Sequence, residues 1–396
     1  MNNKETRNEN APGGAVFSSD GALAARVVSF RRDLHRIPEL GRNLPKTTAY
    51  LLDYLRTLPC EITPVTDAGF VAFFRAPAAS PRSTIAFRTD MDALPIEEAT
   101  GLDFASEHPG CMHACGHDGH MSMLLGLAAW ISENLESLPV NVLLVFQAAE
   151  ETTGGAKDFC ASTVFADHGV KAIYGQHLWP GFPKGTVICR RGDFMASTFV
   201  FVIDILGRST HVGTYRQGID ALEAGAAYIS RIYEMEKTVV ASDVRRLLRV
   251  GRFESGRTAN VVPAKAQLEG TLRTYDPAVH ELMWSRMLEI AGDIEQQTGA
   301  RFTLRHSDAY PAVRNPDELF DRAKAALTGA GISFFEPEEP LLIAEDFGCY
   351  GQILPSLYLH LGTGVDAALH TNNYMLDEDV LMDGVRVFRE ILLSYK

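Results

Sequence analysis

Short apolar runs alternate with stretches of helical spacing in the first half of the chain, and this alternation limits the possible folds more than any other feature. Buried strands are predicted at 84–88, 141–146, 172–176 and 186–189. Helices are predicted at 119–135 and 155–161, with two more inside 22–58, the second opening at Leu44-Pro45. Strands that alternate with helices predict an α/β domain whose sheet is flanked by helices.

The pattern changes near Met195, where strands and helices are arranged differently. Strands are predicted at 197–205, 247–253, 266–274 and 301–306, and helices at 220–236 and 277–298. Four strands with two helices indicate a small α+β unit of the split βαβ, ferredoxin-like type. We therefore expect an inserted domain over 195–305, between a first catalytic part at 1–194 and a second at 306–396. The first 20 residues are expected to be a mobile tail.

The charge and the apolar content exclude several classes of protein. Lys and Arg number 37 against 50 Asp and Glu, and a net charge of −13 disfavours binding to nucleic acid. The N-terminal residues lack the apolar core of a signal peptide, and no apolar run is long enough to span a membrane. We expect a cytoplasmic protein with six reduced cysteines.

Two cysteines and three histidines crowd into the segment 111–120. Cys115 and His117 are separated by one glycine, which lets the backbone turn so that thiolate and imidazole can reach the same cation. A buried cysteine beside a hydrogen-bonded histidine is the alternative interpretation. Because Asp118 and His120 lie alongside, the metal site is favoured.

A pair of carboxylates follows the predicted strand at 141–146. Glu150 and Glu151 are placed where open α/β sheets carry their sites, at the carboxyl end of a strand. One carboxylate can bind a cation while its neighbour moves a proton near neutral pH. An isolated Glu-Glu pair is more often an exposed surface feature, but this one directly follows a hydrophobic strand.

Two further histidines, His177 and His370, each follow a run that resembles a strand. Together with Cys115, His117 and Glu151 they would supply five ligands, enough for two divalent ions if one ligand bridges. A thiolate with histidines favours zinc, and a carboxylate-rich pair also accepts manganese or cobalt. Asp92, after another predicted strand, is expected to orient a ligand histidine.

The chain resembles subfamily D of peptidase family M20, the amidohydrolases that include hippurate hydrolases, N-acyl-amino-acid aminoacylases and indole-acetyl-amino-acid hydrolases. The resemblance runs from about Arg31 to the end of the chain. It rests on the ordered motifs LHRIPEL (34–40), RTDMDALP (88–95), HACGHD (113–118), FQAAEE (146–151), GQHLWP (175–180), TANVVP (258–263), GTLRT (270–274), AEDF (344–347) and LH (369–370).

The resemblance implies a metallopeptidase-type catalytic domain with a mixed sheet and an inserted lid that forms a homodimer or a larger homo-oligomer. Two metal ions would be held by Cys115, His117, Glu151, His177 and His370. Glu150 would be the general base and acid. His211 would reach the partner's active site, and Asn260 and Arg273 would hold the carboxylate of a small substrate. Around His211 the chain departs from the family, with Arg208-Ser209-Thr210 before it and no proline soon after.

The leading functional hypothesis is metal-dependent hydrolysis of the amide bond in N-acyl or N-aroyl amino acids, with Glu150 as the base and His211 stabilising the oxyanion. A dipeptidase and a hydrolase that removes an amino group from an aromatic ring are alternatives that keep the same site. A metal-binding regulator without catalysis is a third possibility, and it leaves Glu150 without a role.

Overall fold

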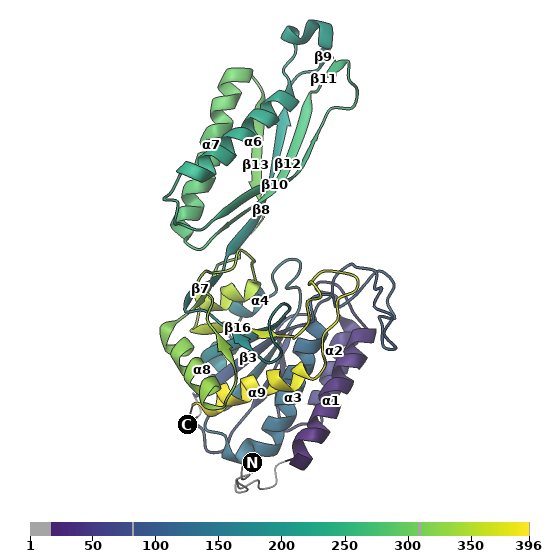
Figure 1. Cartoon of the computed structure of the whole chain (residues 1–396), viewed down its shortest axis with the longest axis vertical. Coiled ribbons are helices and arrows are strands. Elements are labelled where there is room, and N and C mark those ends of the chain that lie inside the picture. Colours follow the sequence, from purple (N-terminus) through teal and green to yellow (C-terminus); the bar gives the residue numbers. More distant parts are fainter. Residues whose placement is uncertain (1–16, 81–82, 308–309, 396) are drawn as a thin grey trace, which may run out of the picture.

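The computed structural model describes residues 17–80, 83–307 and 310–395, which form a large domain and a small one (Figure 1). The small domain comprises residues 197–306, and the large domain is made from the chain on both sides of it. Helix α1 (Phe17–Arg36) already includes the last part of the expected tail, and residues 1–16 lie outside the described chain. No helix among the described residues is long and apolar enough to cross a membrane.

The large domain is built on an eight-stranded sheet with the order β1-β2-β4-β3-β5-β16-β6-β15. Its strands are β1 (Glu61–Pro64), β2 (Phe70–Phe74), β3 (Thr84–Asp90), β4 (Asn141–Gln147), β5 (Val170–Trp179), β6 (Val187–Ile188), β15 (Phe334–Phe335) and β16 (Ser356–Gly362). Strand β3 runs parallel to β4 and β5, and β5 runs parallel to β16, whereas β2 pairs antiparallel with β1 and β4. The expected mixed sheet is confirmed.

Both faces of this sheet are buried, which explains why its central strands are continuously apolar. In β4, Val142 and Leu144 join one core cluster and Leu143 and Val145 join the other. The first face is covered by α1, α2 (Pro45–Leu55), α3 (His117–Asn134), α8 (Asp317–Gly329) and α9 (Val380–Leu393). The second is covered by α4 (Ala156–Ala161), α5 (Val164–Asp167) and the 3-10 helix η3 (Asp346–Gln352). The expected flanking helices are present.

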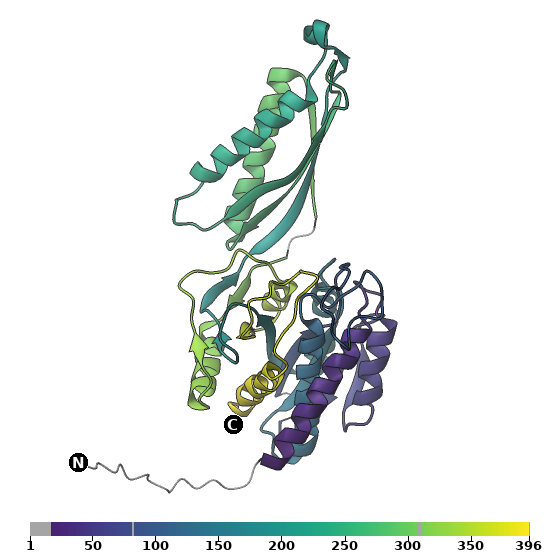
Figure 2. The same cartoon turned by 45° about the vertical axis from the view of Figure 1, so that its right-hand side comes forward.

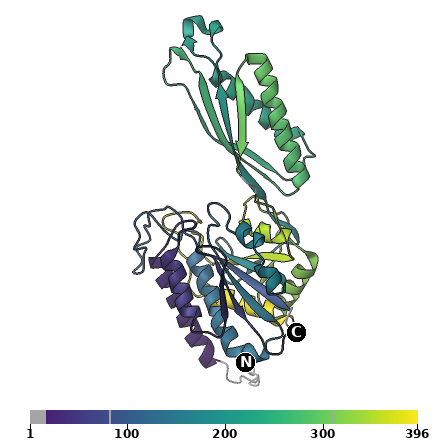
Figure 3. The same cartoon turned by 180° about the vertical axis from the view of Figure 1, so that it is seen from behind.

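The small domain is an antiparallel sheet with two helices on one side only (Figures 2 and 3). Its order is β10-β12-β8-β13, from β8 (Ser197–Leu206), β10 (Leu247–Ser255), β12 (Lys265–Thr274) and β13 (Arg301–His306). Helices α6 (Ala221–Thr238) and α7 (Pro277–Thr298) cover it. Along β8, Phe199 and Phe201 are buried against the helices while Val200 is half exposed, as alternation over a one-sided core requires.

Short strands that the sequence pattern did not reveal form the ends of the small domain. At its far tip, β9 (Thr210–His211) pairs with β11 (Val261–Val262), and the 3-10 helix η2 (Val212–Gln217) follows β9 (Figure 1). At its root, β7 (Gly192–Met195) pairs with β14 (Val313–Asn315). The chain therefore leaves the large domain and returns to it at adjacent points.

Candidate metal centre

The five expected ligands converge near the ends of the central strands. Cys115 lies in the loop before α3, and the left-handed Gly116 (φ 83°) turns the chain so that His117 begins the helix. Glu151 follows β4. His177 lies within β5 and not after a strand, as the sequence suggested, because β5 continues to Trp179. His370 does not follow a strand either: it lies in an irregular segment with φ 60°.

Sulfur and carboxylate oxygen lie between the imidazoles of this cluster. Sγ of Cys115 is 3.3 Å from Nε2 of His177 and 3.3 Å from Nε2 of His370. Oε1 of Glu151 is 3.2 Å from Nε2 of His370 and 3.8 Å from Nε2 of His117. Two candidate ligand groups, Cys115/His117/His177 and Cys115/Glu151/His370, therefore share the thiol.

Two observations fit a cation at this position. Nε2 of His117 and Oε1 of Glu151 are buried; the first has no hydrogen-bond partner among the described residues, and the second has the His370 imidazole at 3.2 Å. Burial lowers the pKa of His177 and so favours the neutral imidazole, which is the form that binds a metal. Burial raises the pKa of the Cys115 thiol, and Glu151 and Glu150 add to this shift, so a thiolate at this position requires a cation beside it. Unsatisfied buried acceptors are costly, and a bound cation would satisfy them.

Hydrogen bonds to carbonyl oxygens fix the tautomers of two histidines. Nδ1 of His117 donates to the carbonyl oxygen of Asp92 at 2.7 Å, and Nδ1 of His177 donates to that of Leu178 at 2.7 Å. Because a carbonyl can only accept, the proton stays on Nδ1, and the Nε2 lone pair of each ring faces the cluster. Both rings therefore present the atom that a metal binds.

Asp92 has two contacts here, and they differ from the expected one. Its backbone carbonyl orients His117, whereas its carboxylate lies 3.8 Å from Nδ1 of that ring. The carboxylate instead accepts the N–H groups of Glu150 and Glu151 at 3.0 and 3.1 Å. Asp92 thus positions both the histidine and the loop that carries the two glutamates.

His120 belongs to the dense sequence cluster but is not free to bind a metal. Nδ1 of His120 is 2.6 Å from Oδ1 of Asp90, and Nε2 accepts the N–H of Leu178 at 2.9 Å. Asp90 in turn pairs at 2.7 Å with Arg88, a fully buried guanidinium. This chain of contacts positions the backbone next to His177, and it was not predicted from the sequence. Arg88 and Asp90, two charged residues inside the otherwise apolar strand β3, were the feature of the sequence from which it could have been predicted.

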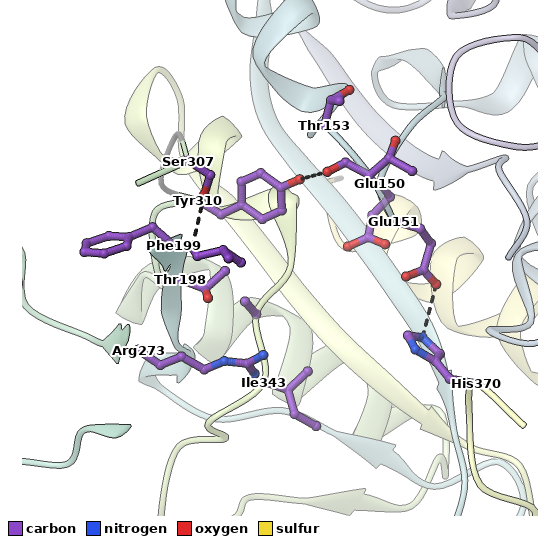
Figure 4. Close-up of a pocket in the computed structure, with 13 residues that line it drawn as sticks. Glu150, Glu151, Thr153, Thr198, Phe199, Arg273, Ser307, Tyr310, Ile343 and His370 are labelled. Atoms are coloured by element: carbon purple, nitrogen blue, oxygen red, sulfur yellow. Dashed lines mark hydrogen bonds and ion pairs between the residues drawn. The ribbon is translucent and has the colours of Figure 1, made fainter. Parts of the chain in front are cut away.

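A cavity of about 530 Å³ opens beside the cluster, and Glu150, Glu151, Arg273, Tyr310 and His370 line it together (Figure 4). Burial raises the pKa of Glu150 well above its usual range, and the carboxylates of Glu345 and Glu151 add to the shift. Nη1 of Arg273 donates to the carbonyl of Leu342 at 2.6 Å, and its Nε has no partner among the described residues. The cavity therefore combines a partly buried carboxyl with a guanidinium.

A second cavity, of about 350 Å³, adjoins the thiol and adds an apolar wall. Trp179, Met195, Ile343 and Leu369 line it together with Cys115 and His177. The Trp179 ring stacks on His360 with 4.0 Å between ring centroids and 10° between planes.

Residues 86–394 of the chain match peptidase family M20/M25/M40. The chain belongs to this family. It is 32% identical over 378 residues to an uncharacterized hydrolase of Staphylococcus epidermidis, a match covering 93% of this chain and 98% of that relative. The solved structure of the Bacillus subtilis YXEP protein, described as a dinuclear metal-binding peptidase of the M20 family, is 31% identical, with a TM-score of 0.82 over 94% of this chain and 98% of that one. The crystal structure of a protein from methicillin-resistant Staphylococcus aureus is 27% identical, with a TM-score of 0.88 over 95% of this chain and 98% of that one.

Two of the expected site residues of this M20 hydrolase lie far from the cluster of candidate metal ligands. His211 and Asn260 are neighbours at the tip of the small domain, where the N–H of Val212 donates to the Asn260 carbonyl at 3.2 Å (Figure 1). Arg273 lies at the other end of that domain, where it lines the same cavity as Glu150. Within one chain, Asn260 and Arg273 therefore do not form the expected carboxylate-binding pair, because the length of the small domain separates them.

Proposed function

We propose that this M20 hydrolase belongs to subfamily D and cleaves the amide bond of N-acyl or N-aroyl amino acids. The observation that carries the proposal is one cavity that brings together Glu150, two of the candidate ligands and the guanidinium of Arg273. A hydrolysable bond placed between these groups would have a proton acceptor on one side and a carboxylate receptor on the other. Each part follows from the chemistry of its residues.

Two divalent cations, zinc, manganese or cobalt, would be held by Cys115, His117, Glu151, His177 and His370. When bound, such ions lower the pKa of water and polarise a carbonyl. Glu150 lies beside this cluster within the same loop as Glu151. Its carboxylate would accept a proton from the attacking water and return it to the nitrogen of the leaving amine.

Arg273 would bind the carboxylate of the amino-acid half. Its guanidinium keeps donors free after one bond to the Leu342 carbonyl, and no salt bridge to it is present among the described residues. A planar fork of donors matches a carboxylate. The acyl or aroyl half would lie on the apolar wall of Trp179, Met195 and Leu369.

His211 and Asn260 would act on the site of a second subunit in a homodimer. In one chain they are at the opposite end of the small domain, so only another copy or a large rearrangement can bring them to a site. Exposed apolar side chains surround them, with Val212 and Val261 each 42% exposed and Tyr215 59% exposed. Such residues at a tip are suited to contact with a partner. His211 would then donate to the oxyanion.

The test is a substrate panel assayed with zinc, manganese and cobalt. It contains N-benzoyl and N-acetyl amino acids, the same compounds with the carboxylate converted to an amide, dipeptides, and aromatic amines. We expect hydrolysis of the acylated acids and at least a tenfold loss with the neutral amides. Glu150→Gln should keep its metal and lose on the order of 1,000-fold in kcat; Glu136→Gln, at an exposed position, is the control.

Cleavage of dipeptides alone, or release of ammonia from aromatic amines, would replace this proposal by one of the alternatives. Metal binding without any hydrolysis would indicate the regulator. Unchanged activity in Glu150→Gln would remove that residue as the base.

A further inference from the structure

Tyr310 lies where the chain returns from the small domain, and it contacts both domains. Its N–H and carbonyl pair with Thr198 at the root of β8, at 2.9 and 3.1 Å. Its hydroxyl donates to the carbonyl oxygen of Thr152 at 3.2 Å, in the loop that carries Glu150 and Glu151 (Figure 4). One residue thus connects the base of the small domain to the loop of the two glutamates.

The loop over 149–155 is shaped to receive this side chain. Gly154 has φ 75°, and a Cβ built there would lie 2.6 Å from the Tyr310 ring, so the ring rests directly on the glycine backbone. The N–H groups of Gly154 and Gly155 donate to the carbonyl of Ala149 at 2.9 and 3.3 Å. These bonds close a tight turn immediately around the glutamates.

Other contacts hold the same loop from the large domain alone. Asp92 accepts the N–H groups of Glu150 and Glu151, and Nε of Arg42 donates to Oγ1 of Thr153 at 3.0 Å. Tyr310 differs from both because it lies on the connecting segment. The carbonyl oxygen of the next residue, Pro311, packs closely on Gly348 of the large domain, where a Cβ would lie 2.2 Å from it. A rotation of the small domain must therefore act on the backbone at Tyr310.

We propose that Tyr310 is a positioning residue that couples the orientation of the small domain to the placement of Glu150 and Glu151. The Thr152 bond forms in the orientation seen here, and rotation of β8 withdraws the phenol through its pairing with Thr198. Coupling of this kind is reciprocal, so the bond also favours this orientation. The proposal rests on the proposed role of Glu150 for its catalytic meaning, but not for the coupling itself.

Tyr310→Phe is the decisive variant because it removes the hydroxyl and keeps the ring on Gly154. Tyr275→Phe is the matched control: Tyr275 also donates to a backbone carbonyl at the domain junction, that of Leu341 at 2.6 Å, and among the described residues its hydroxyl has no hydrogen bond to the loop. Both variants are studied as full chains loaded with manganese, with metal content measured.

Two measurements that need no substrate test the coupling. Hydrogen exchange of a peptide covering 147–156 should be about fivefold faster in Tyr310→Phe, the effect of one lost hydrogen bond, and unchanged in Tyr275→Phe. Spin labels on unnatural amino acids at exposed Lys237 and Glu61, in labelled protein diluted with unlabelled protein, report the distance between domains. Its distribution should shift in Tyr310→Phe.

Unchanged exchange in Tyr310→Phe would overturn the proposal, and so would faster exchange with an unchanged distance distribution, which would make the bond purely local. With any substrate that the enzyme hydrolyses, Tyr310→Phe should lower kcat while KM stays within about twofold. If the substrate panel fails but exchange and distance change together, the coupling stands and the proposed function does not.

Discussion

Sγ of Cys115 lies 3.3 Å from Nε2 of His370, although 255 residues separate them in the chain. The large domain therefore closes its candidate metal centre with segments from both sides of the small domain. A cation bound between these side chains would link the two parts of the large domain, so its removal should affect stability as well as activity.

Chelation should lower the melting temperature by on the order of 10 °C, because a ligand present far above its Kd stabilises by about 4 kcal/mol. Adding back zinc or manganese should restore it. The measurement is calorimetry on chelated and reloaded protein, with metal content determined. Cys115→Ser should remove this dependence on metal, and Cys60→Ser, at a partly buried cysteine distant in sequence from the ligands, should keep it. An identical melting temperature with and without bound metal would contradict the assignment.

Arg88→Met should destabilise the protein by about 3–5 kcal/mol, the usual cost of breaking a buried ion pair. The guanidinium is fully buried between Asp90, Glu345 and Asp346, at 2.7, 3.1 and 2.8 Å. Without it, three carboxylates would remain buried together. Urea unfolding gives the change in free energy, and Arg56→Met is the control because Arg56 pairs with Asp53 on the surface at 3.3 Å. A change below about 1 kcal/mol would contradict this account.

Stability should fall as the pH rises from about 6.5 to 9, and His35 is the reason. Burial alone would lower its pKa, but the carboxylate of Asp118 at 2.8 Å and that of Glu98 at 3.2 Å raise it to about 9. Below 6.5 both folded and unfolded states hold the proton, and the ion pairs stabilise fully. Between 6.5 and 9 only the folded state keeps it, so up to about 3 kcal/mol is lost.

The measurement for His35 is urea unfolding of wild type and His35→Gln at several values of pH. The variant should be less stable at pH 6 and show a flatter slope between 6.5 and 9. An equal slope in both proteins would assign the pH dependence to other groups.

Mixing two inactive variants should restore activity if His211 acts on the partner's site. In a heterodimer of Glu150→Gln and His211→Ala, one of the two sites has an intact Glu150 and receives an intact His211. Random exchange of subunits gives half heterodimers, so activity should recover to roughly a quarter of wild type. The assay follows activity after dissociation and reassembly of equal amounts. No recovery, with heterodimers shown to form, would place His211 on its own chain's site.

The fold was predictable where the pattern of burial is simple. Strand β4 is apolar throughout because both of its faces are covered, and α7 and β13 have the same bounds as the segments predicted from spacing. The two-residue strands β9 and β11 were not predictable, since a run of two residues has no periodicity to read. Each of these strands forms only by pairing with the other, and the two come together only when the chain folds.

In the site too, features set by neighbouring residues could be predicted from the sequence, and features set by distant parts of the chain could not. The ligand types could be read from local spacing at Cys115 and His117. The position of His370 could not, because its segment has no regular structure and its backbone takes a positive φ. Asp92 was expected to orient a ligand histidine, and it is its backbone carbonyl, directed to His117 by the turn after β3, that does so. Backbone atoms carry no sequence signature, so contacts of this kind remain hidden.

Strands β7 and β14 pair antiparallel, so the small domain connects them as the loop of a β-hairpin connects its two strands. Each strand of the eight-stranded sheet has its neighbours without it, so the tip can be lengthened, recharged or replaced without changing any register in the catalytic half. Modularity of this kind would let the tip of the small domain vary separately from the candidate metal centre. The unusual residues before His211 lie in the part of the chain that is free to vary in this way.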